Sequence, residues 1–445
     1  MFTRFVAAAL VCCINTSLIL VAEDASAHSG NPNPHFGSSG SAVYSPASYV
    51  YDVADPFAID QTSRIAFGTN TAAGGMVAVL DASGNPDSSF ATGGVLSLDG
   101  QFVDVKIDSE NRIVVAQVGF DGVNADVLVS RFASDGSIDA SFGTGGSTSI
   151  SYPGYDLQSQ AITLDADDNI FAAATKISTF ASDVQMVVAK FSADGSTDTK
   201  FATGGLLVLS FAPAGSERSL PQALTAGPDG SIYLAGTTLQ PSLDTETDVV
   251  KITPDGLLSP SFGHGVGYIQ FDALPTAAFS HETFAASIAL DAGGNILLGG
   301  YAGDYSTMLS AALAARFLPS GDPDPAFNGG TPQLAFAGGA QFNYGSTVLV
   351  DARGSIVLTG FAFPDIDSDP QLFAFRFTDG GAPDSTFGAT GIGYTVLPDA
   401  VMNGASAFSH RGDIVMLGNA SDGGSFIWDE LIGYDPPPLS PPTHF

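Results

Sequence analysis

The chain has 445 residues, and 46 acidic side chains against 14 basic ones give it a formal net charge of -32 at pH 7. A field of this sign repels nucleic acids and anionic lipids, so the composition argues against both as partners. The two cysteines, Cys12 and Cys13, lie near the start of the chain, and the rest of the sequence offers no thiol for a disulfide or a metal site.

The first 27 residues have the pattern of a secretory signal. Arg4 supplies a positive charge, residues 5–22 are mostly apolar, and Ala25-Ser26-Ala27 is a small-x-small cleavage site. A membrane anchor is the alternative, but polar residues at 15–17 interrupt the apolar stretch. Cleavage leaves 13 basic and 44 acidic side chains. The mature protein is expected in the periplasm, at the cell surface or outside the cell, without inserting into a membrane.

Two short phrases recur along the chain at a spacing of about 60 residues. The first is a phenylalanine three residues after an Asp, Asn or Ser, and its copies are Phe36, Phe90, Phe142, Phe201, Phe262, Phe327 and Phe387. The second is a polar turn followed by isoleucine, at Ile65, Ile113, Ile170, Ile232, Ile296, Ile356 and Ile414. Seven interleaved copies of each phrase predict a closed array of equivalent repeats.

The copy between Phe142 and Phe201 shows what one repeat contains. Its β-branched and aliphatic runs, bounded by Gly, Asp, Asn and Pro, predict four strands at 147–152, 161–164, 170–175 and 184–191. No segment keeps the apolar period of about 3.6 residues that marks a helix. The fold class is therefore predicted to be all-β.

Four antiparallel strands form a sheet with two apolar faces, which copies bury by packing face to face around an axis. The prediction is a seven-bladed β-propeller of four-stranded antiparallel blades over residues 28–434. The first phrase, followed by a strand at 41–45, lacks an upstream strand, whereas the strands at 414–417 and 426–432 lack a phrase after them. The N-terminal strand is therefore expected to close the last blade. Residues 435–445 contain five prolines and are predicted to form a tail.

The repeated polar residues have a structural interpretation. The Asp before the phenylalanine can accept backbone N–H groups in a short turn, and the glycines after it permit positive φ. A basic residue stands eleven positions before the phenylalanine in five copies, as Arg131, Lys190, Lys251, Arg316 and Arg376. We expect it to pair with an acid of the same loop. A ring of cations that recognises an anionic ligand is the alternative.

The run from Arg131 to Gly146 shows the whole phrase, a strand followed by Asp-Gly and then by Asp-x-x-Phe-Gly-x-x-Gly. This pattern resembles the bacterial delta-60 repeat, a β-propeller-type repeat of exported proteins, and the order of strands and turns is similar to that of NHL-type propellers. Two copies depart from it, with Ser259 in place of Asp and Asn328 in place of Gly. The resemblance implies the fold and export, and it brings no catalytic residues.

Calcium is the metal that fits so acidic a chain. Asp365, Asp367 and Asp369 place oxygen ligands at alternating positions, as calcium loops do, and residues 165–169 do so within an ordinary turn between strands. Both segments lack the glycine and the glutamate of an EF-hand. The three aspartates are the candidate metal ligands, and no other cofactor is expected.

The histidines form no closely spaced pair that would indicate a zinc site. They are His28, His35, His264, His281, His410 and His444. Of these, His264 and His281 lie in the same repeat and depart from its pattern, so they are the histidines to examine for a site.

The chain has no G-x-S-x-G elbow and no P-loop. The leading interpretation is therefore a monomeric, non-enzymatic exported propeller that presents its loops to a protein or a glycan. The alternative is a calcium-dependent hydrolase of the lactonase-type propeller class, with carboxylates holding the ion in the central channel.

Overall fold

The computed structural model describes residues 30–45, 56–72, 74–120, 122–178, 184–211, 218–240, 244–274, 281–304, 307–351, 353–365, 367–388, 392–397, 400–420, 425–431 and 433. The predicted signal at 1–27 and the predicted tail at 435–445 lie outside these residues, as do His28 and His444.

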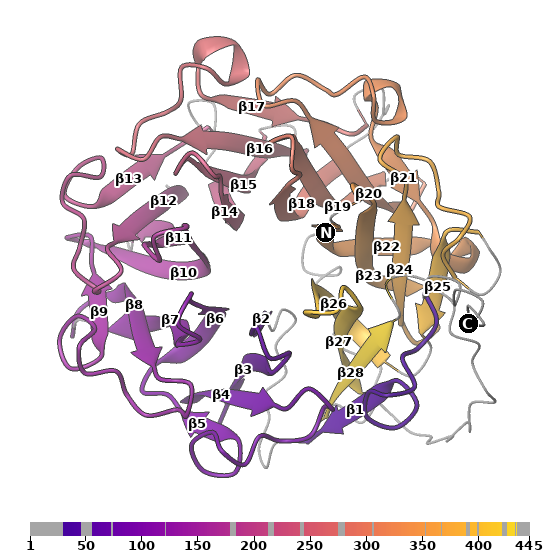
Figure 1. Ribbon diagram of the computed structural model, residues 1–445. Coiled ribbons are helices and arrows are strands. Elements are labelled where there is room, and N and C mark those ends of the chain that lie inside the picture. The colour runs from indigo at the N-terminus through magenta and orange to yellow at the C-terminus, as the bar shows by residue number, and fades with distance from the viewer. Residues whose placement is uncertain are drawn as a thin grey trace, which may run out of the picture.

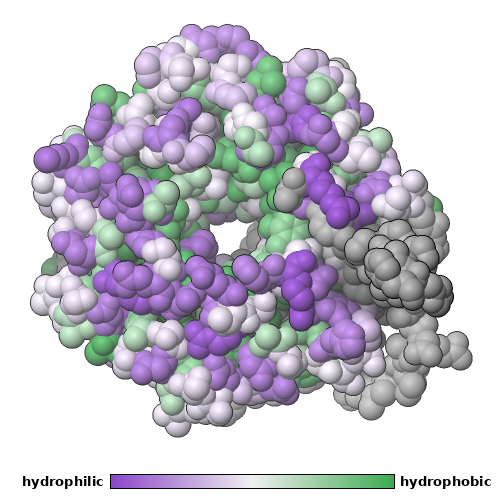
Figure 2. All heavy atoms as spheres, in the orientation of Figure 1, coloured by the Kyte–Doolittle hydropathy of each residue, from purple (hydrophilic) through white to green (hydrophobic). Residues whose placement is uncertain are grey.

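Antiparallel sheets are arranged in a ring (Figure 1), and the space-filling view shows an opening at its centre (Figure 2). In the described parts of the chain the helices are short 3₁₀ turns, η1 (Gly263–Gly265), η2 (Asn328–Gly330) and η3 (Ala337–Gly339). The prediction of an all-β protein is confirmed, and the ring is a β-propeller.

No helix in the described segments has the length and apolar character needed to span a membrane.

The strands follow one another in groups of four, and corresponding members of each group take the same place in the ring (Figure 1). The first strands, which border the opening, are β2 (Phe57–Ile59), β6 (Gln101–Ile107), β10 (Tyr155–Leu164), β14 (Arg218–Ala226), β18 (His281–Leu290), β22 (Phe342–Val350) and β26 (Ala400–Phe408). The second strands are β3 (Ile65–Thr71), β7 (Ile113–Phe120), β11 (Ile170–Ser178), β15 (Ile232–Leu239), β19 (Ile296–Asp304), β23 (Ile356–Phe363) and β27 (Ile414–Ala420).

The third and fourth strands complete each group toward the outside of the ring. The third strands are β4 (Gly74–Leu80), β8 (Ala125–Phe132), β12 (Val184–Phe191), β16 (Thr245–Ile252), β20 (Leu309–Phe317), β24 (Gln371–Phe377) and β28 (Phe426–Leu431). The outermost strands are β5 (Val95–Ser97), β9 (Ser147–Ile150), β13 (Leu206–Leu209), β17 (Tyr268–Phe271), β21 (Gln333–Ala335), β25 (Tyr394–Leu397) and β1 (Ser41–Tyr44).

Antiparallel pairing gives three separate four-stranded sheets and one sixteen-stranded sheet that contains β10 to β25. Within the long sheet, single parallel residue pairs join β12 to β14, β16 to β18 and β20 to β22, so four-stranded groups also repeat there. β1 pairs antiparallel with β28, from Ser41 opposite Asp429 to Tyr44 opposite Phe426. This is the pairing between the two ends of the chain that the sequence predicts.

The strand beside the opening is longer than its apolar pattern predicts. The strand expected at 161–164 is β10, which begins at Tyr155 and pairs with β11 along its length. Its register shifts between Ser159 and Ala161. Such an irregularity breaks the alternation of side chains between the two faces, which is the signal used to find a strand in the sequence.

The phenylalanine phrase forms the loop between the third and fourth strands. In the group of β8 and β9, Asp139 Oδ1 accepts the backbone N–H of Ser141 (3.1 Å), and Phe142 is fully buried. Gly143 has a φ of 54°, and a Cβ there would lie 2.3 Å from the carbonyl oxygen of Ser147. Glycine adopts this positive φ without a steric cost and recurs at the position, whereas Ala91, Ala202 and Asn328 hold it with a positive φ in three other copies.

The repeated basic residues are structural. Arg131 is buried, its Nε donates to Asp139 Oδ2 (2.8 Å), and its Nη1 donates to the carbonyl of Ala193 in the next group (2.5 Å). The guanidinium also lies over the ring of Phe142, with Cζ 4.6 Å from the centroid. The equivalent ion pairs are Arg316–Asp324, Arg376–Asp384 and Lys190–Asp198. The expected pairing within the loop is confirmed for these four residues, and in Arg131 it also ties neighbouring groups together. Lys251 departs from it, because Ser259 replaces the loop aspartate and the ammonium pairs with Asp229 in the turn between β14 and β15.

Two further groups make this contact with different residues. The first group has Val79 at the basic position, and Arg64, which directly precedes β3, reaches Asp87 instead (3.2 Å). In the group closed by β1, Glu430 occupies the basic position, and the amide of Asn33 donates to its carboxylate (3.1 Å). At the junction between the chain ends, the residue of the third strand thus accepts the hydrogen bond and the residue of the loop donates it. In the groups with a basic residue on the third strand, the direction is the opposite.

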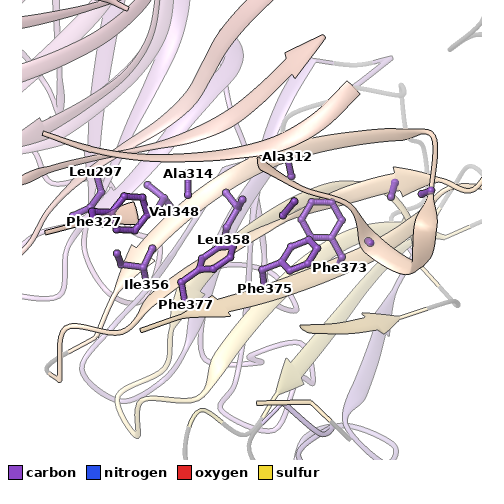
Figure 3. Close-up of a cluster of buried hydrophobic side chains, with 14 residues drawn as sticks. Leu297, Ala312, Ala314, Phe327, Val348, Ile356, Leu358, Phe373, Phe375 and Phe377 are labelled. Carbon is purple, nitrogen blue, oxygen red and sulfur yellow. The ribbon is translucent and has the colours of Figure 1, made fainter. Parts of the chain in front are cut away.

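The hydrophobic core lies between neighbouring groups of strands. Figure 3 shows one cluster, in which Phe373, Phe375 and Phe377 of β24 lie near Leu358 of β23 and Ala312 of β20. This cluster takes side chains from two adjacent groups of strands, because one four-stranded group cannot cover both of its own faces. The ring is thus held together by burial between its members.

Because neighbouring strands of a group run antiparallel, the connections between strands lie at two opposite ends of the ring. The turns between first and second strands and the phenylalanine phrases lie at one end, which we call the turn end. The loops between second and third strands and the crossovers between groups lie at the other, which we call the crossover end.

Candidate functional site

Aromatic side chains of two neighbouring groups form a row at the crossover end, on the first and second strands of each group. Phe284 stacks on Tyr301, with centroids 5.2 Å apart, and Tyr301 meets the edge of Tyr344 at 4.9 Å. Tyr344 stacks on Phe361 at 5.2 Å, and Phe363 lies 5.9 Å from Phe361. All five side chains are half-buried, so the row also faces solvent. We call these five residues the aromatic row.

The aromatic row departs from the repeat. Phe284 and Tyr344 stand twelve positions before the repeated isoleucine, and Tyr301 and Phe361 stand five positions after it. In the other five repeats, neither position is aromatic. Residues that only serve the shared packing recur in every repeat. Aromatic residues at matching positions in two adjacent repeats therefore indicate a local role, and a comparison of the repeats is the sequence signal that would have found them.

The hydroxyl of Tyr344 bonds to Ser310 and interacts with the negative charge of Glu282. Ser310 forms a hydrogen bond with the phenol, and Ser310 Oγ accepts the backbone N–H of Asn343 (3.0 Å). Burial raises the pKa of Tyr344 above its ordinary value, the nearby Glu282 carboxylate raises it further, and the Ser310 bond acts in the opposite direction. The phenol is therefore protonated at neutral pH, and the site combines a proton donor with a carboxylate.

His281 links two connections at the same end of the ring. Its Nε2 lies 3.0 Å from Asp272 Oδ2, and its Nδ1 lies 3.7 Å from Asp244 Oδ1. Its backbone N–H also donates to Asp244 Oδ1 (3.0 Å). Both ring nitrogens face carboxylates, so the side chain ties the start of β18 to the segments next to β16 and β17.

The two candidate histidines lie apart. His264 precedes β17 at the turn end, where its side chain is 86% exposed, whereas His281 contacts Asp272, which follows β17 at the crossover end. His35 and His410 are exposed.

The predicted metal ligands Asp365, Asp367 and Asp369 are exposed in the loop between β23 and β24. Asp365 Oδ1 accepts the backbone N–H of Asp367 (2.9 Å), which uses one ligand oxygen within the turn. Asp165, in the other acidic segment, has both carboxylate oxygens bonded to its own turn. Over the described parts of the chain, no group of three or more Asp, Glu, His or Cys side chains is arranged to hold a metal. The calcium site stays a prediction.

A buried carboxyl group on β16 forms hydrogen bonds that link the strands β14 to β17. Asp248 in β16 is fully buried, and its oxygens accept hydrogen bonds from Thr238 (2.5 Å) and Gln270 (3.0 Å). Thr238 is bonded in turn to Ser219 (2.9 Å). Burial without a cationic partner raises the pKa of Asp248 to about 6. The corresponding residues of the other groups are apolar: Met76, Leu128, Val187, Leu313, Phe373 and Ile427.

We expect Asp248 to make stability fall with rising pH. Its folded pKa of about 6 exceeds the ordinary 3.8, so the folded state keeps this proton more tightly than the unfolded state does. The stability that the protonated carboxyl contributes is fully present below pH 3.8. It is lost as the pH rises toward 6, which lowers the free energy of unfolding by about 3 kcal/mol in all. Asp248→Asn should remove this loss and unfold at a higher urea concentration than the parent at pH 7.

The control for that measurement is Asp135→Asn, which changes an exposed carboxylate in a turn whose bond from Ser137 an amide oxygen can also accept. Urea unfolding of the three proteins between pH 4 and 7 gives the comparison. Identical slopes of stability against pH for the parent and Asp248→Asn would show that the buried carboxyl does not titrate as described.

No family model matches the chain, and no curated protein matches it. Among solved structures it is similar to an ulvan lyase of a new polysaccharide lyase family, at 13% identity over 89% of this chain and 95% of that one, with a TM-score of 0.49. It is also similar to a gluconolactonase from Xanthomonas campestris, at 12% identity over 78% and 96% of the chains, with a TM-score of 0.38. An endo-arabinase from Bacteroides thetaiotaomicron is 12% identical over 58% and 92%, with a TM-score of 0.36.

These comparisons contradict the interpretation of the chain as a non-enzymatic binding scaffold. The proteins with similar structure are named as a lyase, a lactonase and an arabinase, and the alternative of a propeller hydrolase agrees better with them. The expectation that the protein is not an enzyme is therefore wrong by this comparison. The substrates in these names belong to those proteins, and the likeness is one of fold.

Proposed function

We propose that the chain is an exported seven-bladed propeller of the delta-60 repeat type, in which each group of four strands is one blade. The count is supported by 28 strands in the described residues and by buried clusters that each join two neighbouring groups. Export is supported by the signal-like pattern at residues 1–27.

We further propose that the protein is an enzyme that cleaves a saccharide held on the aromatic row. The observation that carries this proposal is the row itself, which lies on β18, β19, β22 and β23 at the crossover end and includes the Tyr344 hydroxyl, whose pKa the charge of Glu282 helps to raise. Sugar rings present apolar C–H faces, which pack on aromatic rings while the hydroxyl groups bond to polar neighbours. Half-buried rings keep their positions before the ligand binds, so little side-chain entropy is lost on binding.

Tyr344 and Glu282 supply the two groups that acid–base cleavage requires. The Tyr344 hydroxyl gives its proton to the glycosidic oxygen, and the bond between that oxygen and the anomeric carbon breaks. A water molecule adds to the anomeric carbon, and Glu282 takes the proton that the water loses. Proton exchange with solvent then restores both side chains. Ser310, which bonds to the phenol, orients it toward the substrate.

The calcium-dependent version of the hydrolase is a separate matter. The described residues form no metal-binding group, so we derive no step through a metal. The saccharide proposal uses only side chains of this chain.

The direct test is incubation of the mature protein with a panel of oligosaccharides and polysaccharides, followed by measurement of new reducing ends. Cleavage of at least one saccharide is expected, and EDTA should leave its rate unchanged. Hydrolysis of lactone or ester substrates alone, or no cleavage of any saccharide, would refute the proposal. Loss of activity in EDTA that calcium restores would favour the metal-dependent alternative.

A further inference from the structure

The charges around the aromatic row are distributed unevenly between the two ends of the ring. The segment 244–397, which contains both groups that build the row, has four basic residues: Lys251, Arg316, Arg353 and Arg376. Each lies at the turn end, and three are paired there with an aspartate. Arg353 lies in the turn between β22 and β23.

Two described lysine and arginine residues lie away from the turn end, and both belong to other groups of strands. They are Lys176 in β11 and Arg218 in β14. Lys176 lies over the rings of Tyr152 and Tyr155. Neither of them lies on the strands that carry the aromatic row.

Carboxylates lie along the row instead. Glu282 stands two residues before Phe284 on β18, and the two side chains therefore share one face of the sheet. Beyond Phe363, the exposed Asp365, Asp367 and Asp369 follow in the next loop. Among the described residues, an anionic saccharide placed on these rings would meet acidic side chains and no lysine or arginine, which disfavours a uronic acid or a sulfated sugar.

We propose that the saccharide bound on the aromatic row carries amino groups, as a glucosamine polymer does. An ammonium group is attracted both to the faces of aromatic rings and to carboxylates. Rings that pack against the sugar body, bordered by acids that face its amino groups, match this chemistry and reject acidic sugars. This inference rests on the proposed function, because it names the substrate class of the same site.

Binding of three tetrasaccharides tests the inference by calorimetry at an ionic strength of about 0.15 M and at mildly acidic pH, where the amino groups are charged. The probes are a glucosamine tetramer, an N-acetylglucosamine tetramer and a glucose tetramer. We expect the glucosamine tetramer to bind about tenfold more tightly than the two neutral probes. Glu282→Gln should remove most of this preference, measured as the ratio of the affinities for the glucosamine and glucose tetramers.

The matched control is Asp135→Asn, because it removes one exposed carboxylate of the same charge from a turn-end loop of another group. It should leave the preference intact. An equal loss in Asp135→Asn and Glu282→Gln would show that the net charge of the protein, and not this site, attracts the amine, and would refute the inference.

The outcomes separate this inference from the proposed function. If the neutral tetramers bind as tightly as the glucosamine tetramer and are cleaved, the amine preference is wrong and the saccharide-cleaving function stands. If no tetramer binds and no saccharide is cleaved, both are wrong. The Phe361→Ala variant should weaken the binding of all three probes by a similar factor, because the ring packs against the sugar body of each of them.

Discussion

Tyr344→Phe should retain the affinity for saccharide and lose catalytic rate. The substitution keeps the ring that stacks on Phe361 and removes only the hydroxyl, which bonds to Ser310. Loss of a positioned proton donor typically lowers the rate by about 10²- to 10⁴-fold. We expect kcat to fall by about that factor while KM stays close to that of the parent, as measured by the release of reducing ends.

A control on the same surface keeps this prediction specific. Phe336→Ala removes an aromatic ring that is 47% exposed and lies outside the row, so kcat should change little. The parent Tyr344 has a raised pKa, so its activity should persist to alkaline pH until the phenol ionises. A Tyr344→Phe variant with unchanged kcat would exclude the phenol as the proton donor.

Phe36→Ala should destabilise the whole ring. Phe36 is only 2% exposed, and it comes from the N-terminal segment into a cluster that includes Leu417 and Trp428 of the C-terminal strands and Phe67 of β3. Truncation of a buried phenylalanine to alanine costs about 3–5 kcal/mol, because apolar contacts are lost and a cavity remains. We expect the free energy of unfolding in urea to fall by about that amount.

Two comparison variants show whether this loss reflects closure of the ring. Phe142→Ala makes the same change at the same phrase within the chain, where the residue is also fully buried, and it should cost a similar amount. Val43→Ala changes a side chain of β1 that is 64% exposed, and its cost should be small. If Phe36→Ala unfolds like the parent while Phe142→Ala does not, the N-terminal segment does not complete the ring.

Much of the fold could be predicted because each repeat solves the same packing problem. The strand pattern, the glycine turns and the pairing of Arg131 with Asp139 follow from residue types that recur at fixed positions. The pairing of β1 with β28 followed from strands left over at the two ends. The length of β10 could not be predicted, because the register shift after Ser159 breaks the alternation of side chains.

The candidate site was much less predictable. The sequence suggests Asp365, Asp367 and Asp369 as metal ligands because they stand at alternating positions in one short segment. In the structure they lie exposed in one loop. The residues of the aromatic row are separated along the chain. In the sequence, each has the same appearance as the other apolar residues of its strand. Asp248 is equally inconspicuous, since its burial depends on the sheets on either side of it.

The sequence by itself determined the all-β class, the repeat and the meeting of the two chain ends, because these depend on local turn chemistry and on which residues are apolar. Only the tertiary structure decided which side chains meet at the centre. Phe284 and Phe361 are 77 positions apart, and they join one row because neighbouring sheets bring their inner strands together at the same end of the ring. A contact of that kind depends on how whole sheets pack, which no local pattern of residues records.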